Sequence, residues 1–158
     1  MNPNGLIPTI RLGDFVLWES NAILRYLNNK FGKEKFDLEK TALVDQWTDW
    51  SGDLSREMTT VYRQLIRTPE KERNMQQVKQ ALNKLNALWK ILDNYIGEKK
   101  SKFIVGDSLT VADVATGSFL HRYYNIAIER PHYPHIEAWH KRLSERKGFK
   151  EFVQVELV

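Results

Sequence analysis

Residues 5–23 read GLIPTIRLGDFVLWESNAI and predict a small β-hairpin followed by a helix. Two short β-prone runs flank Gly13-Asp14, and a dipeptide of this kind favours a tight turn between antiparallel strands. After Ser20 the apolar residues recur at helical spacing, and Gly32 lies just past the last of them. A two-stranded ribbon with one helix is marginally stable in water, so this unit is too small to stand alone.

From about Asp37 onward the sequence predicts helices only. The first is expected to end before Pro69, because the residue before a proline disfavours helical backbone. A stripe of apolar residues marks the second, and Gly97 is expected to end it. We therefore expect an α+β chain that is mostly α, with a hairpin-and-helix unit at residues 1–31 and an all-helical unit at 37–158. The expected helices cover residues 38–67 and 70–96, begin at Thr110, and follow Pro134 and Gly148.

The helix start at Thr110 carries a capping-box pattern. Thr110 places a hydroxyl at the N-cap, and Asp113 places a carboxylate three residues later, so each side chain can bond a free backbone N–H of the other. This pattern predicts a well-capped helix and gives Asp113 a structural role rather than a catalytic one.

The charge pattern bears on the class of partner. The chain has 158 residues and a net charge of +4, but its basic side chains are interleaved with acidic ones, as in residues 70–73. Such interleaving is typical of solvated helix faces. Only residues 99–102 form a basic cluster. We therefore expect no nucleic-acid partner.

The absence of cysteine excludes disulfides, cysteine-bound zinc and a thiol nucleophile, and it is typical of a cytoplasmic protein. The four histidines lack the spacing of a metal triad, so we expect no metal site. No apolar stretch is long enough to cross a membrane, and the first residues do not resemble a secretory signal. We expect neither a membrane segment nor secretion.

Two features near the hairpin suggest a ligand. Pro8 stands at the start of a strand, where it removes one donor from the strand ladder. Ser20 lies where strand meets helix, and free backbone amides and the helix dipole there attract an anion such as a carboxylate. Glu19 beside it can receive an ammonium group, so a ligand with an α-amino and an α-carboxyl group would satisfy the pair. The alternative is structural: an edge proline and a helix N-cap.

Three separated motifs resemble those of the glutathione transferase family, in the same order, and a fourth resembles the family's approach to its last helices. The resemblance covers essentially the whole chain, and it implies a thioredoxin-like domain followed by an all-helical domain. The phrase LWESNAI at residues 17–23, taken with LIRTP at 65–69, resembles a bacterial branch. The four motifs are NPNGLIP at residues 2–8, ESNAI at 19–23, GDSLTVAD at 106–113 and PHIEAW at 134–139.

The resemblance implies a glutathione site in the first unit. Pro8 would be a cis-proline, and the backbone of Ile7 would pair with the cysteinyl part of glutathione. Glu19 and Ser20 would hold the γ-glutamyl end. Glutathione would be a cosubstrate, and no bound cofactor is expected. Leu6 departs from the pattern, because many relatives carry a polar or basic side chain there.

By the same resemblance, further strands and helices would precede Asn2, and among them the residue that activates the glutathione thiol. That catalytic residue has no counterpart in this sequence. Activation matters because the thiolate is the nucleophile and a free thiol has a pKa of about 8.5. We expect a detoxifying glutathione transferase that conjugates the thiolate to small electrophiles. The alternative is a non-catalytic binding or structural module.

The resemblance also suggests where an electrophile and a second subunit bind. Arg63 and Arg67 lie four residues apart on one face of the first long helix, whose far end borders the electrophile pocket in this family. They can attract an acidic electrophile or form a solvated, acid-paired face. Tyr123 likewise has two interpretations, as part of the wall of the electrophile pocket or as a core residue. We expect a homodimer formed through the helices after Asp37, or one in which exchange with a partner covers the hairpin.

Overall fold

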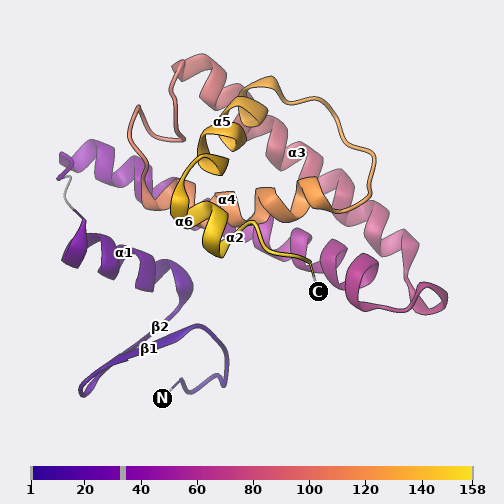
Figure 1. Ribbon diagram of the computed structural model, residues 1–158, viewed down its shortest axis with the longest axis horizontal. Coiled ribbons are helices and arrows are strands. Elements are labelled where there is room, and N and C mark those ends of the chain that lie inside the picture. Colours follow the sequence, from indigo (N-terminus) through magenta and orange to yellow (C-terminus); the bar gives the residue numbers. More distant parts are fainter. Residues whose placement is uncertain (1, 33–34, 158) are drawn as a thin grey trace.

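The computed structural model describes residues 2–32 and 35–157, and Figure 1 shows a hairpin and one helix beside a group of further helices. Strands β1 (Thr9–Leu12) and β2 (Phe15–Trp18) pair antiparallel, with Thr9 opposite Trp18 and Leu12 opposite Phe15. Gly13 supplies the positive φ of 62° that the two-residue turn needs. The predicted hairpin is confirmed.

Helix α1 (Ser20–Phe31) follows β2 and ends before Gly32, as the sequence predicts. Its start differs from the prediction, because Glu19 and not Ser20 occupies the N-cap. The Glu19 carbonyl accepts the first helical hydrogen bond, from the Ile23 N–H at 2.9 Å. The interpretation of Ser20 as an N-cap is therefore wrong, since the backbone turns one residue earlier and Ser20 is already helical.

The rest of the chain is helical, which confirms the predicted α+β class with mostly helices. The helices are α2 (Leu38–Tyr62), which continues as a π-helical turn (Arg63–Arg67), a 3-10 turn (Glu70–Glu72), α3 (Met75–Lys99), α4 (Val111–Asn125), α5 (Pro134–Ser144) and α6 (Lys147–Phe152). Helix α4 packs along α2, α2 packs along α3, and α5 lies against α3 and α4 (Figure 1).

The hydrophobic core lies between α2, α3, α4 and α5 and contains large aromatic side chains. Trp89 and Trp139 are completely buried, and Trp89 contacts the ring of Tyr123 with 5.6 Å between centroids. Such closely packed interiors hold the helices in one arrangement. Other fully buried side chains are Leu54, Met58 and Val61 of α2, Leu85 and Leu92 of α3, Leu120 of α4 and Ile136 of α5.

Both ends of α3 differ from the prediction. Asn74 caps the helix by accepting from the Gln77 N–H at 3.0 Å, so α3 begins at Met75, later than expected. Gly97 lies inside the helix, which continues beyond it. A Cβ atom on Gly97 would lie 2.5 Å from Nε2 of His135. The glycine therefore permits the close approach of α5 to α3 and does not end the helix.

Thr110 and Asp113 form the predicted capping box at the start of α4. The buried Asp113 carboxylate accepts hydrogen bonds from the Thr110 N–H and hydroxyl, both at 2.8 Å. It also accepts from the Ile104 N–H and from Trp139 Nε1, both at 2.9 Å. Burial raises the pKa of Asp113, and these donors act in the opposite direction. One carboxylate thus joins the loop before α4, α4 itself and α5.

Candidate functional site

A cleft of about 570 Å³ lies between the hairpin-and-helix unit and the helical part of the chain. Pro8, Glu19 and Ser20 line it together, although the sequence separates Pro8 from the other two by a whole hairpin. The facing wall comes from α2 and α4. The other lining residues are Asn21, Ile23 and Leu24 of α1, Ser51, Gly52 and Ser55 of α2, Val114, Ala115, Ser118 and Phe119 of α4, and Val153.

The start of the hairpin lies at one edge of the cleft. The Ile7–Pro8 peptide bond is cis, as the resemblance implies. The Ile7 side chain is 94% exposed and does not line the cleft. The backbone of Ile7 directly precedes the cleft-lining Pro8 and the first paired strand residue, Thr9.

At the start of α1, free backbone donors lie beside a carboxylate. Glu19 has a φ of 71°, a left-handed conformation that is uncommon for a residue with a side chain and that clusters at ligand sites. Because helical bonding begins at the Ile23 N–H, the N–H groups of residues 20–22 precede it. The first turn of α1 has no acidic side chain that would neutralise the positive end of the dipole. The junction can hold an anion at the helix end and a cation at Glu19.

The facing wall of the cleft carries three serine hydroxyls, which the sequence analysis missed. Ser51 Oγ donates to the Thr48 carbonyl at 2.6 Å, and Ser118 Oγ donates to the Ala115 carbonyl at 3.2 Å. Both hydroxyl oxygens remain able to accept a hydrogen bond. The available signal was the spacing of Ser51 and Ser55, four residues apart and therefore on one face of a helix.

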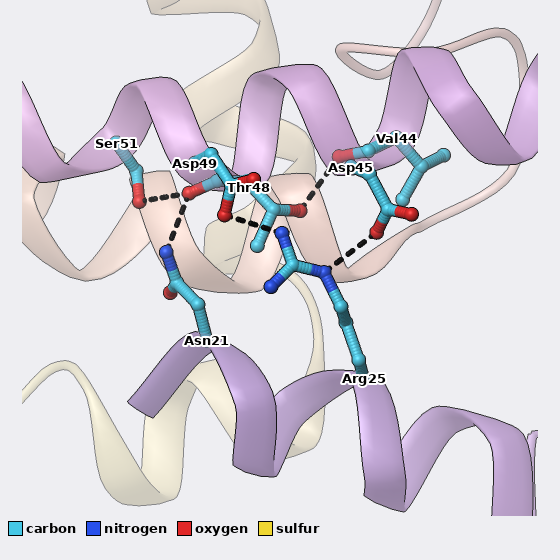
Figure 2. A network of polar contacts seen from close by, with 7 residues as sticks. All are labelled: Asn21, Arg25, Val44, Asp45, Thr48, Asp49 and Ser51. Atoms are coloured by element: carbon cyan, nitrogen blue, oxygen red, sulfur yellow. Dashed lines mark hydrogen bonds and ion pairs between the residues drawn. The ribbon is translucent and has the colours of Figure 1, made fainter. Parts of the chain in front are cut away.

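Polar contacts join α1 to α2, as Figure 2 shows. Asn21 Nδ2 donates to the Thr48 carbonyl at 2.7 Å. Arg25 Nε donates to Asp45 Oδ1 at 2.7 Å, and the same guanidinium pairs with Asp49. Burial lowers the pKa of Arg25, but the hydrogen bonds and charges of the two carboxylates outweigh it and raise that pKa overall. Arg25 therefore stays charged between them.

The three residues predicted to border an electrophile pocket do not line this cleft. Tyr123 is completely buried and its hydroxyl donates to Asn86 Oδ1 at 2.7 Å. Its burial raises its pKa above the usual range. Arg63 and Arg67 lie in the π-helical turn after α2, and Arg67 stacks on the ring of Tyr62 at 5.3 Å. Tyr123 is thus a core residue rather than a pocket wall, because no part of it reaches the surface.

The described parts of the chain contain neither a candidate metal centre nor a helix that could span a membrane. Within residues 2–32 and 35–157, no three histidine or carboxylate side chains are grouped so that they could hold a metal ion. No helix in the same ranges is long and apolar enough to cross a membrane.

Models of known families match both parts of the chain. The glutathione S-transferase N-terminal domain matches residues 1–30, and the C-terminal domain matches residues 56–156. The chain belongs to the glutathione S-transferase family. The glutathione S-transferase GstB of Escherichia coli is 32% identical over 161 residues, which cover 98% of this chain and 76% of GstB. Glutathione S-transferase A of Pleuronectes platessa is 27% identical over 155 residues, with 95% and 69% covered.

Solved structures of this family superpose closely on the chain. The theta class glutathione S-transferase of Xanthomonas axonopodis pv. citri, with glutathione bound, gives a TM-score of 0.92 at 32% identity. This match covers 99% of the chain and 76% of that structure. Its apo form gives a TM-score of 0.88 at 31% identity, with 96% and 81% covered. Together with GstB, these similarities place the chain in the bacterial branch of the glutathione S-transferases.

Proposed function

We propose that the cleft binds glutathione, with the γ-glutamyl end at Glu19 and Ser20 and the cysteinyl part beside the Ile7 backbone. The observation that carries the proposal is the meeting of Pro8, Glu19 and Ser20 in one cleft. The charges support it, because the γ-glutamyl end presents one ammonium and one carboxylate. Glu19 matches the ammonium, and the start of α1 matches the carboxylate. The similar Xanthomonas enzyme was solved with glutathione bound.

The proposed reaction is conjugation of the glutathione thiolate to a small electrophile. The cleft volume lies within the range usual for small-molecule sites, so it can hold a tripeptide with a modest second substrate. Its lining includes the apolar side chains of Val114, Phe119 and Val153, which suit the electrophile. Holding both reactants together supplies the positioning part of the rate. Arg63 and Arg67 stay a prediction for acidic electrophiles that reach the far end of α2.

We further propose two domains, at residues 1–31 and 37–158, and a cytoplasmic location. The two family models divide the chain in a compatible way, with the first ending at residue 30. The absence of cysteine supports a reducing compartment.

Glutathione titration followed by calorimetry tests the binding proposal. Glu19→Gln should weaken binding about tenfold or more, because it removes the charge that faces the ammonium. Arg67→Ala is the matched control, since Arg67 does not line the cleft and its loss should leave glutathione affinity unchanged. If the parent chain and Glu19→Gln bind equally, the assignment of Glu19 to the peptide is wrong.

Conjugation assays with haloalkyl, haloaryl and peroxide substrates test the reaction. Because the thiolate is the nucleophile, glutathione-dependent turnover would support the hypothesis that the protein is a transferase. Tight glutathione binding without turnover on any of these substrates would favour the non-catalytic binding module instead.

A further inference from the structure

A set of polar contacts, which we call the clasp, fastens α1 to α2. The clasp consists of Asn21 and Arg25 on α1 and of Asp45, Thr48 and Asp49 on α2. Figure 2 shows both α1 side chains pointing toward α2. Asn21 and Arg25 are four positions apart on α1, and Asp45 precedes Thr48 and Asp49 by three and four positions on α2, so the contacts extend over successive turns of both helices.

Apolar packing holds α1 only weakly in place. Among the twelve residues of α1, Ile23 alone is classed as buried, whereas α2 and α3 each bury seven. The hydrophobic contribution of a half-buried helix is correspondingly small. The position of α1 relative to α2 therefore depends on the clasp more than is usual for a helix in a core.

The clasp also connects the two walls of the cleft. Asn21 lines the cleft from α1, and Ser51 lines it from α2. Both side chains donate to the same acceptor, the Thr48 carbonyl, at 2.7 and 2.6 Å. One oxygen atom therefore fixes the spacing between the walls at this point. Asn21 follows Ser20 directly, so any movement of Asn21 carries the free N–H groups at the start of α1 with it.

We propose that Asn21 and Arg25 are positioning residues. They hold the start of α1 at a fixed distance from the cleft wall that carries Ser51, Ser55 and Ser118, so that a bound peptide can contact the start of α1 and this wall at once. The inference rests on the proposed function, since the peptide is glutathione. Asn21 acts at the cleft itself. Arg25 acts one turn further along α1, where its two ion pairs stop the helix from sliding or tilting along α2.

Ion pairs of this kind respond to salt, which gives the clasp a recognisable property. The side chains of Arg25, Asp45 and Asp49 are 30%, 44% and 66% exposed, so water and ions reach them. Exposed pairs lose most of their attraction when the Debye length falls to about 3 Å at 1 M salt. High salt should therefore loosen α1 in the parent chain and change little when Arg25 is already absent.

Amide hydrogen exchange of the unliganded chain gives the first test. Asn21→Ala and Arg25→Met should speed exchange in α1 by about tenfold or more, while α3 and α4 exchange at the parent rate. Arg25→Lys, which keeps the charge, should recover part of the protection. Asn29→Ala is the matched control, because it makes the same chemical change to an exposed residue on the same helix, outside the cleft. Unchanged exchange in α1 would overturn the clasp.

Glutathione affinity gives the second test. Asn21→Ala should weaken binding about fivefold to tenfold, and in a Ser20→Ala background its effect should fall to about twofold, because Asn21 acts through Ser20. Asn29→Ala should show no such coupling. Faster exchange with unchanged affinity, or fully additive effects of Asn21 and Ser20, would overturn the positioning role. A parent chain that does not bind glutathione would overturn the proposed function, and the exchange data would then still decide whether the clasp holds α1 against α2.

Discussion

Ser20 is the first helical residue of α1 and not its cap, and this separates its role in binding from any role in stability. Ser20→Ala should remove one hydroxyl hydrogen bond to a charged ligand group, worth about 1.5–3 kcal/mol, or tenfold or more in affinity. The free energy of unfolding should change by no more than about 0.5 kcal/mol, since no capping bond is lost. Calorimetric titration and urea unfolding of both proteins measure the two effects. Equal affinity would show that Ser20 does not contact glutathione.

Asp113 is the residue on which the packing of the helical part depends most. Asp113→Asn would turn an amide group toward four donors that need an acceptor, so the unfolding free energy should fall by about 3 kcal/mol or more. Urea unfolding followed by circular dichroism measures the loss. Asp107→Asn is the matched control, because that exposed side chain accepts one bond, from the Lys102 N–H at 3.2 Å. A loss below about 1 kcal/mol would contradict the role assigned to the network.

Among the elements, α6 is held in place by a cluster of rings. Phe149 of α6 meets His121 of α4 and His140 of α5 edge-on, at 6.3 and 6.1 Å between centroids. His140 in turn stacks on Tyr124 at 5.0 Å. Nε2 of His140 is buried and has no hydrogen-bond partner among the described residues. A charge on His140 would be buried here without a partner, so this arrangement of rings is stable only while His140 is uncharged.

Acid should therefore weaken the docking of α6. Burial, and then the charge of His121, lower the pKa of His140 below its usual 6.5. The unfolded chain thus binds more protons than the folded chain, and stability is lost as the pH falls below about 6.5. His140→Phe keeps the stacked ring and should flatten this dependence between about pH 7.5 and 5.5. Urea unfolding at the two pH values checks it, and equal slopes for parent and variant would contradict the effect.

Local patterns predicted the elements well, and tertiary contacts explain where they did not. The hairpin, the start of α4 and its capping box follow from residues close together in the sequence, as with Thr110 and Asp113. Gly97 has a local meaning as a helix end, but contact with His135 overrides it. The same holds for the candidate site. The adjacent placement of Glu19 and Ser20 could be predicted from local sequence, whereas the hydrogen bond from Asn21 to the Thr48 carbonyl depends on how two helices pack.

At the scale of the whole molecule, we predict that a second copy of the chain binds the face shared by α2 and α3. It contains a groove of about 330 Å³ whose lining includes Ile91, a side chain that is 52% exposed. The lining also carries both signs of charge, including the Lys84–Glu57 pair at 3.2 Å. Exposed apolar surface with a charged border is typical of interfaces.

Ile91→Asp should therefore convert the expected dimer to a monomer, because a carboxylate in the groove would be buried without a partner when a second copy covers it. Light scattering at micromolar concentration measures the mass, and circular dichroism shows whether the helices remain. Met75→Asp is a control on the same helix, at an exposed position that does not line the groove. A parent chain that is itself a folded monomer would contradict the expected dimer.

The left-handed backbone of Glu19 implies a conflict between what the chain conformation favours and what the ligand needs. A φ of 71° suits glycine, so Glu19→Gly should relieve strain and leave the protein as stable as the parent or more stable by up to about 1 kcal/mol. Glu19→Ala keeps the strain and should gain nothing. Both variants lose the carboxylate and should bind glutathione more weakly. Selection for folding alone would thus favour glycine at this position, and under the proposed function the glutamate is retained for binding.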